Sequence, residues 1–280
     1  MNAPSLPSVL VCADGHRLAL RDWPLAPGQT PRALVLLVHG LGEHIGRYEH
    51  VARRLNAWGF AVRGYDQYGH GESDGPRGGL GSDKGLLTDL AEVVDATRSL
   101  TGAAMPLILL GHSLGGLVVA RFVSLAIRPV QGLVMSSPAL DPGLNAVQKV
   151  LLALLPPIAP NLRVGNGLDP TLISHDAATV AAYRADKLVH DRIAARLARF
   201  IAEGGAATLS LAPSWRVSTL LLYAGDDKLV NPAGSRAFAA AAPSAVVSAH
   251  CFESLYHEIF NETDPEPVFA ELRKWLDGRF

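Results

Sequence analysis

One stretch near the middle of the chain joins an apolar run to a serine between two glycines, and then to a second apolar run. Residues 106–110 have the composition of a buried strand, and residues 117–122 can continue as a helix. Gly111 and Gly115 stand two positions before and two after Ser113. A sharp strand-to-helix turn brings these positions so close to neighbouring backbone that side chains would collide, and glycine removes the clash. The pattern predicts a strained turn, a nucleophile elbow, that exposes the Ser113 hydroxyl above the edge of a sheet.

Strand-like and helix-like segments alternate along most of the chain. This alternation predicts an α/β fold with a mostly parallel sheet and helices on both faces. The predicted strands cover residues 17–22, 33–39, 61–65, 107–110, 132–136, 219–223 and 246–252. The predicted helices cover residues 48–58, 84–100, 114–126, 233–241 and 267–276. The glycine-rich residues 64–82 are predicted to form a long surface loop.

The alternation breaks between about residues 140 and 216, where the sequence becomes helical and apolar. A core helix should be followed promptly by a strand, and here no strand follows. We therefore predict that residues 141–215 form a mainly helical cap, inserted into a core made of residues 1–140 and 216–280. The pairs Pro156-Pro157 and Gly204-Gly205 are candidate hinges or turns within it.

Two late segments carry groups that activate a serine hydroxyl, which is a poor nucleophile at its ordinary pKa. Of the two aspartates after the predicted strand 219–223, Asp227 is preferred because the glycine and aspartate before it complete the turn. His257 follows the last predicted strand in a loop that can approach Ser113, whereas His250 lies inside that strand. The order nucleophile, acid, base predicts a triad of Ser113, Asp227 and His257.

Two backbone N–H groups are candidates for an oxyanion hole. The first belongs to Leu114, directly after the predicted nucleophile, and the second to Leu41 in the glycine-rich loop after an early strand. Loss of one such donor typically costs about 3 kcal/mol in the transition state of acyl transfer. The alternative is an ordinary glycine turn. His39 and His44 in the same loop lack a third ligand, so we predict no metal there.

Five motifs between about residues 35 and 262 carry a family resemblance. They are His39-Gly40-Leu41-Gly42-Glu43-His44 with Gly46-Arg47-Tyr48, residues 66–75 (Asp-Gln-Tyr-Gly-His-Gly-Glu-Ser-Asp-Gly), Gly111-His112-Ser113-Leu114-Gly115-Gly116, Asp227-Lys228-Leu229 and Tyr256-His257-Glu258. On these residues the chain resembles the monoacylglycerol lipase and lysophospholipase branch of the α/β-hydrolase superfamily, which includes serine aminopeptidase S33-type hydrolases. The resemblance implies the α/β-hydrolase fold, an inserted cap, a Ser-Asp-His triad and activity on esters with one acyl chain. We expect no cofactor.

Several further residues are candidate substrate contacts. Gly40 and His112 stand beside the predicted oxyanion donors and nucleophile. The resemblance places residues 186–190, with His190, near the alcohol end of the pocket, although Lys187 stands where the family usually has proline.

The most apolar part of the predicted cap, residues 150–157, indicates an acyl tunnel. Leu151 and Leu155 are the residues expected to line it. Its leucines are also candidates for transient contact with a membrane or micelle surface, although an apolar cap face can instead pack on the core.

The main hypothesis is a serine carboxylic-ester hydrolase that forms an acyl-enzyme on Ser113. A broad small-ester carboxylesterase, a thioesterase and a cofactor-free perhydrolase would keep the same triad and remain open. A dehalogenase or epoxide hydrolase would need an aspartate in place of Ser113. A small-molecule receptor on the same fold is less favoured, because such proteins often lose a triad member.

The composition narrows the classes of binding partner and the cellular location expected for this chain. The formal net charge of -1 gives no basic field to meet phosphates, so nucleic acid is not an expected partner. Cys12 and Cys251 provide no disulfide framework. The first residues lack the basic and apolar regions of a secretory signal, and no stretch approaches the roughly 20 apolar residues that cross a bilayer. We expect a cytoplasmic protein that meets membranes at most peripherally; the sequence leaves its oligomeric state open.

Overall fold

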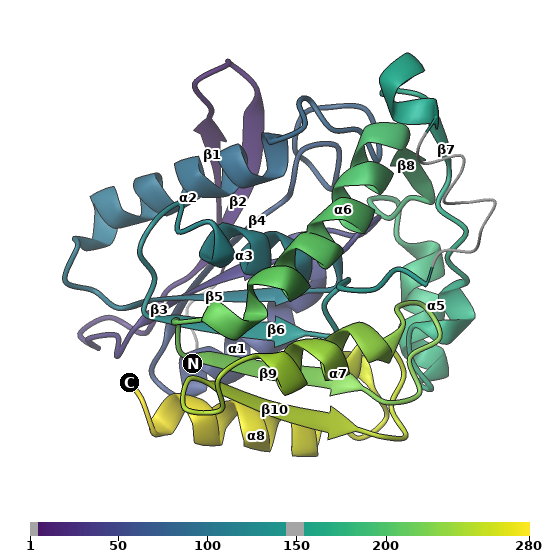
Figure 1. Cartoon of the computed structure of the whole chain (residues 1–280). Coiled ribbons are helices and arrows are strands. Elements are labelled where there is room, and N and C mark those ends of the chain that lie inside the picture. Colours follow the sequence, from purple (N-terminus) through teal and green to yellow (C-terminus); the bar gives the residue numbers. More distant parts are fainter. Residues whose placement is uncertain (1–4, 144–153) are drawn as a thin grey trace.

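The computed structural model describes residues 5–143 and 154–280, and its centre is an eight-stranded sheet (Figure 1). In spatial order the strands are β1 (Leu6–Val11), β2 (Arg17–Trp23), β4 (Ala61–Tyr65), β3 (Leu34–Val38), β5 (Leu107–His112), β6 (Gly132–Ser136), β9 (Thr219–Ala224) and β10 (Val247–Phe252). Strand β2 is antiparallel to both its neighbours, and from β4 to β10 every pair is parallel. The predicted α/β class with a mostly parallel sheet is confirmed.

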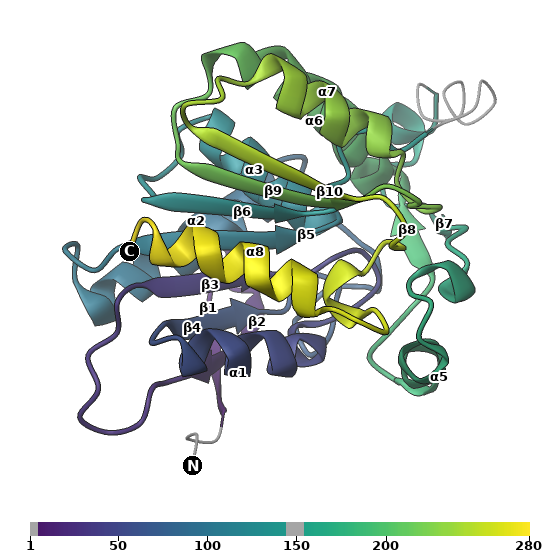
Figure 2. The ribbon, with the colours of Figure 1, turned by 90° about the horizontal axis from the view of Figure 1, so that it is seen from below.

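Side chains of the central strands alternate between two cores, because successive residues of a strand point to opposite faces. In β3, Leu36 and Val38 join the larger cluster, whereas Val35 and Leu37 join the smaller one. Helices on the larger cluster are α2 (Gly85–Thr101), α3 (Leu114–Ser124), α6 (Ala195–Leu211) and α7 (Pro232–Ala241). Helices on the smaller cluster are α1 (Glu49–Ala57) and α8 (Glu266–Asp277). Figure 2 shows the sheet edge-on between these two layers.

The segment between β6 and β9 is less helical than predicted. It contains β7 (Arg163–Gly165), η2 (Pro170–Leu172), α5 (Ala177–Ala185), β8 (Arg192–Ala194), α6 and η3 (Ala212–Ser214). β7 and β8 form a small antiparallel sheet of their own. Together with α5 they lie beyond the carboxyl ends of the central strands (Figures 1 and 2). Candidate residue Leu151 lies outside the described residues, and residues 154–158 are helical.

Helix α6 falls within the predicted insertion, yet it packs on α3 and α7 as part of the core layer. The pair Gly204-Gly205 is the reason. A side chain at Gly205 would overlap the Leu140 carbonyl oxygen, and one at Gly204 would come within 3.4 Å of Leu117. These glycines are therefore a packing surface inside a helix and not a hinge or turn. We propose that the inserted cap ends at residue 194 rather than 215.

Strand β1 was not predicted, and it pairs with β2 at the edge of the sheet with most of its residues exposed. Among the described residues, no helix is long and apolar enough to span a membrane.

Candidate active site

Ser113 stands in a strained turn between β5 and α3. Its φ is +53° and its ψ is -117°, a region that residues with a side chain rarely adopt. A side chain at Gly111 would overlap the carbonyl oxygen of Gly115, and one at Gly115 would overlap that of Val38. The backbone N–H of Ser113 donates to the Ser136 carbonyl oxygen at 3.0 Å, which ties the turn to β6. The geometry is the strand-to-helix turn that the glycine spacing predicts.

The carboxyl ends of three strands bring the predicted triad together. The Ser113 hydroxyl lies 2.8 Å from His257 Nε2, and His257 Nδ1 lies 2.6 Å from Asp227 Oδ2. The other carboxylate oxygen of Asp227 accepts from the N–H groups of Leu229 and Val230, each at 2.9 Å. In the neutral ring, Nδ1–H therefore donates to Asp227 and Nε2 accepts from Ser113, as a general base requires.

Electrostatics shift the pKa values of two neighbouring histidines, His257 of the predicted triad and His112, in opposite directions. Burial disfavours a charged His257, but the charge and hydrogen bond of Asp227 outweigh it and raise the pKa of His257. Burial would raise the pKa of Asp227, yet His257 lowers it. The ring of His112 lies 4.7 Å from that of His257. Burial, aided by the neighbouring His257, lowers the pKa of His112 to about 3, so this ring stays neutral.

Two backbone N–H groups near Ser113 are available to a ligand. Leu114 is the first residue of α3, where a helix has no internal acceptor for its N–H. The N–H groups of Leu114 and Leu41 make no hydrogen bond within residues 5–143 and 154–280. The N–H of Gly40, in contrast, donates to Glu43 Oε1 at 2.6 Å. A Cβ at Gly40 would lie 3.2 Å from that of Ser113, so glycine lets the loop approach the serine closely.

Two cavities open beside Ser113. The larger has a volume of 400 Å³ and mostly apolar walls. Its walls include Leu114, Leu155, Val164, Ile193, Ile201 and Val230. The smaller, of 30 Å³, is lined by Gly40, His112, Ser113, Tyr183 and His257. The predicted contacts Gly40, His112 and Leu155 thus border these cavities.

Comparison with known proteins identifies the family. Residues 29–264 match the family described as serine aminopeptidase, S33. The chain belongs to this family. A monoacylglycerol lipase of Mycolicibacterium smegmatis is 34% identical to this S33 hydrolase over 271 residues, covering 94% of the chain and 93% of the relative. The chain spans 29% of an uncharacterized abhydrolase domain-containing protein of Dictyostelium discoideum, which is 34% identical over 276 residues.

A solved structure gives the same assignment in three dimensions. The crystal structure of a monoacylglycerol lipase from Paleococcus ferrophilus superposes with a TM-score of 0.82 at 34% identity, covering 90% of this chain and 97% of that chain. The expected α/β-hydrolase fold and the resemblance to its lipase branch are confirmed. The S33 hydrolase described here is a carboxylic ester hydrolase.

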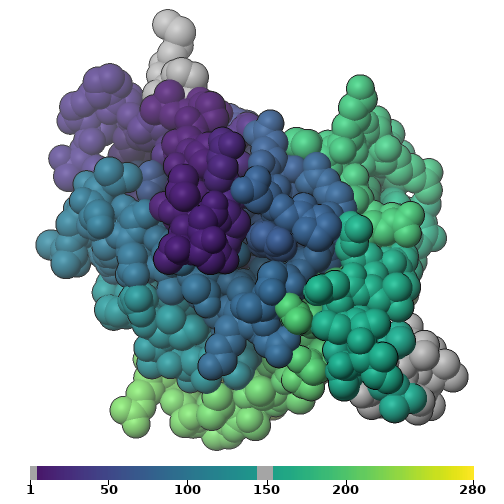
Figure 3. Space-filling model, turned by 90° about the horizontal axis from the view of Figure 1, so that it is seen from above, coloured from purple at the N-terminus to yellow at the C-terminus, as the bar shows by residue number. Residues whose placement is uncertain are grey.

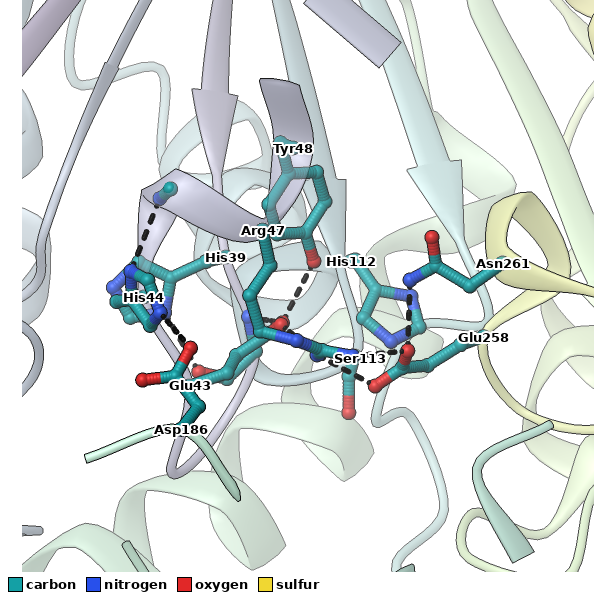
Figure 4. A network of polar contacts seen from close by, with 12 residues as sticks. His39, Glu43, His44, Arg47, Tyr48, His112, Ser113, Asp186, Glu258 and Asn261 are labelled. Atoms are coloured by element: carbon teal, nitrogen blue, oxygen red, sulfur yellow. Dashed lines mark hydrogen bonds and ion pairs between the residues drawn. The ribbon is translucent and has the colours of Figure 1, made fainter. Parts of the chain in front are cut away.

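A buried ionic network supports the loop before the active site (Figure 4). Arg47, in η1 (Ile45–Tyr48), donates to Glu43 at 2.5 Å and to both carboxylate oxygens of Glu258 at 2.7 Å. Glu43 also accepts from the Tyr48 hydroxyl at 2.7 Å. Asn261, in η4 (Ile259–Asn261), donates to Glu258 at 2.8 Å. The network therefore links the loop that carries Leu41 to the segment directly after His257.

Glu43, Arg47 and Glu258 lie within the motifs of the family resemblance, but no role was predicted for them. Glu43 and Arg47 stand among glycines in residues 40–47, whereas no local signal marks Glu258. Burial opposes ionisation of Glu43, but Arg47 outweighs burial and lowers the pKa of Glu43 to about 2. Arg47 also lies 4.7 Å from the ring of Tyr183 in α5, so the network reaches the cap.

The first two histidines of the loop are committed to hydrogen bonds. His39 Nδ1 lies 2.8 Å from the Gly40 carbonyl oxygen, and its Nε2 accepts from the N–H of Gln67 at 2.9 Å. His44 Nε2 lies 2.8 Å from an Asp186 carboxylate oxygen. Both rings hold neighbouring loops in place.

The resemblance predicts that His190 lies near the alcohol end of the pocket, and this stays a prediction. Among the described residues that line the two cavities, His190 is absent. Its ring lies 4.8 Å from the ring of His70, and its backbone N–H donates to the Gly42 carbonyl oxygen at 2.8 Å. The hydrogen bond ties the segment before β8 to the glycine-rich loop that carries Leu41.

Proposed function

We propose that this S33 hydrolase cleaves esters of single-acyl-chain lipids, such as monoacylglycerol or lysophospholipid, through an acyl-enzyme on Ser113. One observation carries the proposal: a serine within 2.8 Å of a buried histidine lies in the wall of an apolar cavity of 400 Å³. Cavities of about 300–1,000 Å³ are typical of small-molecule sites. The names of the bacterial and archaeal relatives support an acylglycerol as the substrate.

The chemistry follows from the geometry of the triad. His257 takes the proton of Ser113 while the serine oxygen attacks the ester carbonyl carbon. The N–H groups of Leu41 and Leu114 hold the oxyanion, and each contributes about 3 kcal/mol to the transition state. His257 then protonates the leaving alcohol, and water repeats the sequence to release the acid. Asp227 keeps His257 in the productive tautomer and stabilises its charged form.

The apolar cavity accounts for the acyl specificity in this proposal. Each methylene group buried from water contributes about 0.8 kcal/mol, so activity should rise with chain length until the cavity is full. Leu155 and Val164 of the cap and Ile201 of α6 form part of its wall. A small ester such as an acetate would leave most of this surface unused.

Chain-length profiles test the proposal. We expect wild type to prefer medium or long chains in monoacylglycerols and in p-nitrophenyl esters, and Ser113→Ala to lose activity on every chain length. Ala198 lines the large cavity, so Ala198→Phe should lower activity on long chains and spare short ones. Ala206→Phe, on the exposed face of the same helix, is the matched control and should change neither.

Two outcomes would contradict the proposal. A maximum at acetate with no turnover of monoacylglycerol would make the protein a small-ester carboxylesterase. Absence of turnover on every ester, with no labelling of Ser113 by a phosphonate, would instead favour a small-molecule receptor.

We further propose that the cap touches lipid surfaces. Leu154, Ile158, Leu162 and Val164 have exposed fractions of 58%, 81%, 47% and 50%, and two of these four, Leu162 and Val164, also line the large cavity. Ile158→Lys should lower activity on micellar monoacylglycerol and leave activity on a monomeric short ester unchanged. Leu100→Lys is the control, since Leu100 is 72% exposed but lies in α2. Equal effects of both variants on micelles would refute the contact.

A further inference from the structure

Three potential metal ligands meet at the turn between β1 and β2, and none of them belongs to the active site. Cys12 and His16 flank the turn, and Asp89 lies in α2. One ligand atom from each residue lies within 4.8 Å of the other two. Cys12 and Asp89 are buried, and His16 is half-buried. Figure 3 shows the hairpin, in dark purple, at the surface beside the blue segment that leads into α2.

Polar atoms at this point lack partners. His16 Nε2 and Asp89 Oδ2 are buried and make no hydrogen bond within the described part of the chain. Buried polar groups are nearly always satisfied, so two such atoms on neighbouring side chains indicate a missing common partner.

The separation of one pair of ligand atoms fits a tetrahedral ion. His16 Nε2 and Asp89 Oδ1 face each other at 3.4 Å without forming a hydrogen bond. Two metal bonds of about 2.0–2.1 Å that meet at a tetrahedral angle separate their ligand atoms by about 3.3–3.4 Å. This pair therefore has the separation of two ligands on one ion.

The histidine is oriented as a metal ligand usually is. Its second ring nitrogen, Nδ1, lies 2.5 Å from Asp14 Oδ1, and Asp14 also accepts from the His16 backbone N–H at 3.1 Å. A carboxylate on the far nitrogen fixes the tautomer of a ligating histidine and directs its other nitrogen at the metal.

We propose that Cys12, His16 and Asp89 bind one Zn²⁺ ion. Sulfur, nitrogen and oxygen together suit this borderline metal, whereas Ca²⁺ and Mg²⁺ require ligands that are all oxygen. The three ligands leave a fourth tetrahedral position for water. The ion connects the β1–β2 hairpin at the sheet edge to α2, and it stabilises the fold because it binds a site absent from the unfolded chain.

Metal titration of the full chain, free of any purification tag and stripped with a chelator, tests the site. Competition with a chromophoric chelator should give one tightly bound Zn²⁺ in wild type. Cys12→Ser and Asp89→Asn should weaken binding by about 100-fold or more, and Asp14→Asn by about 10–100-fold. Cys251→Ser removes the other cysteine and is the matched control, which should bind as wild type does.

Cobalt provides a readout that folding alone does not supply. Wild type loaded with Co²⁺ should show a thiolate charge-transfer band in the near ultraviolet, and Cys251→Ser should keep it while Cys12→Ser loses it. If Cys12→Ser fails to fold, the spectrum of Cys251→Ser still decides, because Cys12 is the one thiol left in that variant. Wild type without a stoichiometric Zn²⁺, or with a Co²⁺ spectrum that lacks the thiolate band, would overturn the site. Binding unchanged in both Cys12→Ser and Asp89→Asn would overturn it as well.

Discussion

At the scale of single residues, Ser113 is held by neighbours that have no side chain. Gly40, Gly111 and Gly115 each stand where a Cβ would press on backbone or on the serine itself. Gly111 and Gly115 stand only two positions from Ser113 in the sequence, which explains why the turn could be predicted without a structure. The direction in which His257 approaches was predicted from chain order and strand ends, which are equally visible in the sequence.

The raised pKa of His257 predicts the acid limb of the pH profile. The ring acts as a base only when neutral, so activity falls as pH drops through its pKa. Because the charge and hydrogen bond of Asp227 outweigh burial and raise this pKa, the midpoint in kcat/KM should lie above about 6.5, the ordinary value. Initial rates on a soluble ester from about pH 5 to about pH 9 measure it.

Asp227→Asn is the control for this assignment. It removes the charge that raises the pKa, so the limb should move to lower pH while the rate falls by up to about 10⁴-fold, as in comparable triads. A wild-type midpoint at or below the ordinary histidine value, or one unmoved by Asp227→Asn, would contradict it.

At the scale of elements, buried strands are easier to predict from the sequence than exposed or very short ones. β3 and residues 107–110 of β5 are apolar throughout because both faces of the sheet are covered there, so these strands stand out in the sequence. β1 is exposed at the sheet edge, and β7 and β8 have three residues each, too few for any periodicity. α6 was predicted to belong to the cap because nothing local shows that Gly204 packs against α3 and Gly205 against Leu140.

The ionic network escaped prediction for a related reason. Arg47 and Glu258 are 211 positions apart, and neither has a local pattern that names its partner. The same holds for the proposed zinc ligands, since Asp89 lies on a helix remote in sequence from Cys12 and His16. Long-range pairing of polar side chains depends on the tertiary structure, whereas strands and turns can be predicted from residues that are neighbours in the sequence.

Removing Arg47 should destabilise the fold strongly. Arg47→Met leaves the carboxylates of Glu43 and Glu258 buried without their cation, which typically costs about 3–5 kcal/mol. Urea unfolding measured at neutral pH gives this difference in the free energy of unfolding. The penalty should shrink at low pH, because a carboxyl that no longer faces Arg47 takes up a proton more readily.

Arg128 supplies the matched comparison. It makes an equally good two-point ion pair with Asp95, at 2.8 Å for each bond, but this pair is exposed to solvent. Arg128→Met should leave the free energy of unfolding close to the wild-type value. Similar losses in the two variants would show that burial does not set the contribution of the Arg47 network.

At the scale of the whole molecule, the active site should lower overall stability. Ser113 at φ +53° is strained by about 1–3 kcal/mol, whereas glycine adopts this conformation freely and loses about 0.5–1 kcal/mol of backbone entropy on folding. Ser113→Gly should therefore be more stable than Ser113→Ala by about 0.5–2 kcal/mol, and we expect both variants to be inactive. Chemical unfolding of the two proteins, neither of which has the serine hydroxyl, isolates the backbone contribution.

Ala126 separates strain from function in the same experiment. It is exposed, lies just after α3 and has φ +50°, so Ala126→Gly should also raise the free energy of unfolding, with esterase activity unchanged. The elbow would not be strained in solution if Ala126→Gly raised the free energy of unfolding while Ser113→Gly and Ser113→Ala had equal values. Gains at both positions, with activity lost only at Ser113, would mean that the fold tolerates this conformation at the elbow because it places the hydroxyl beside His257.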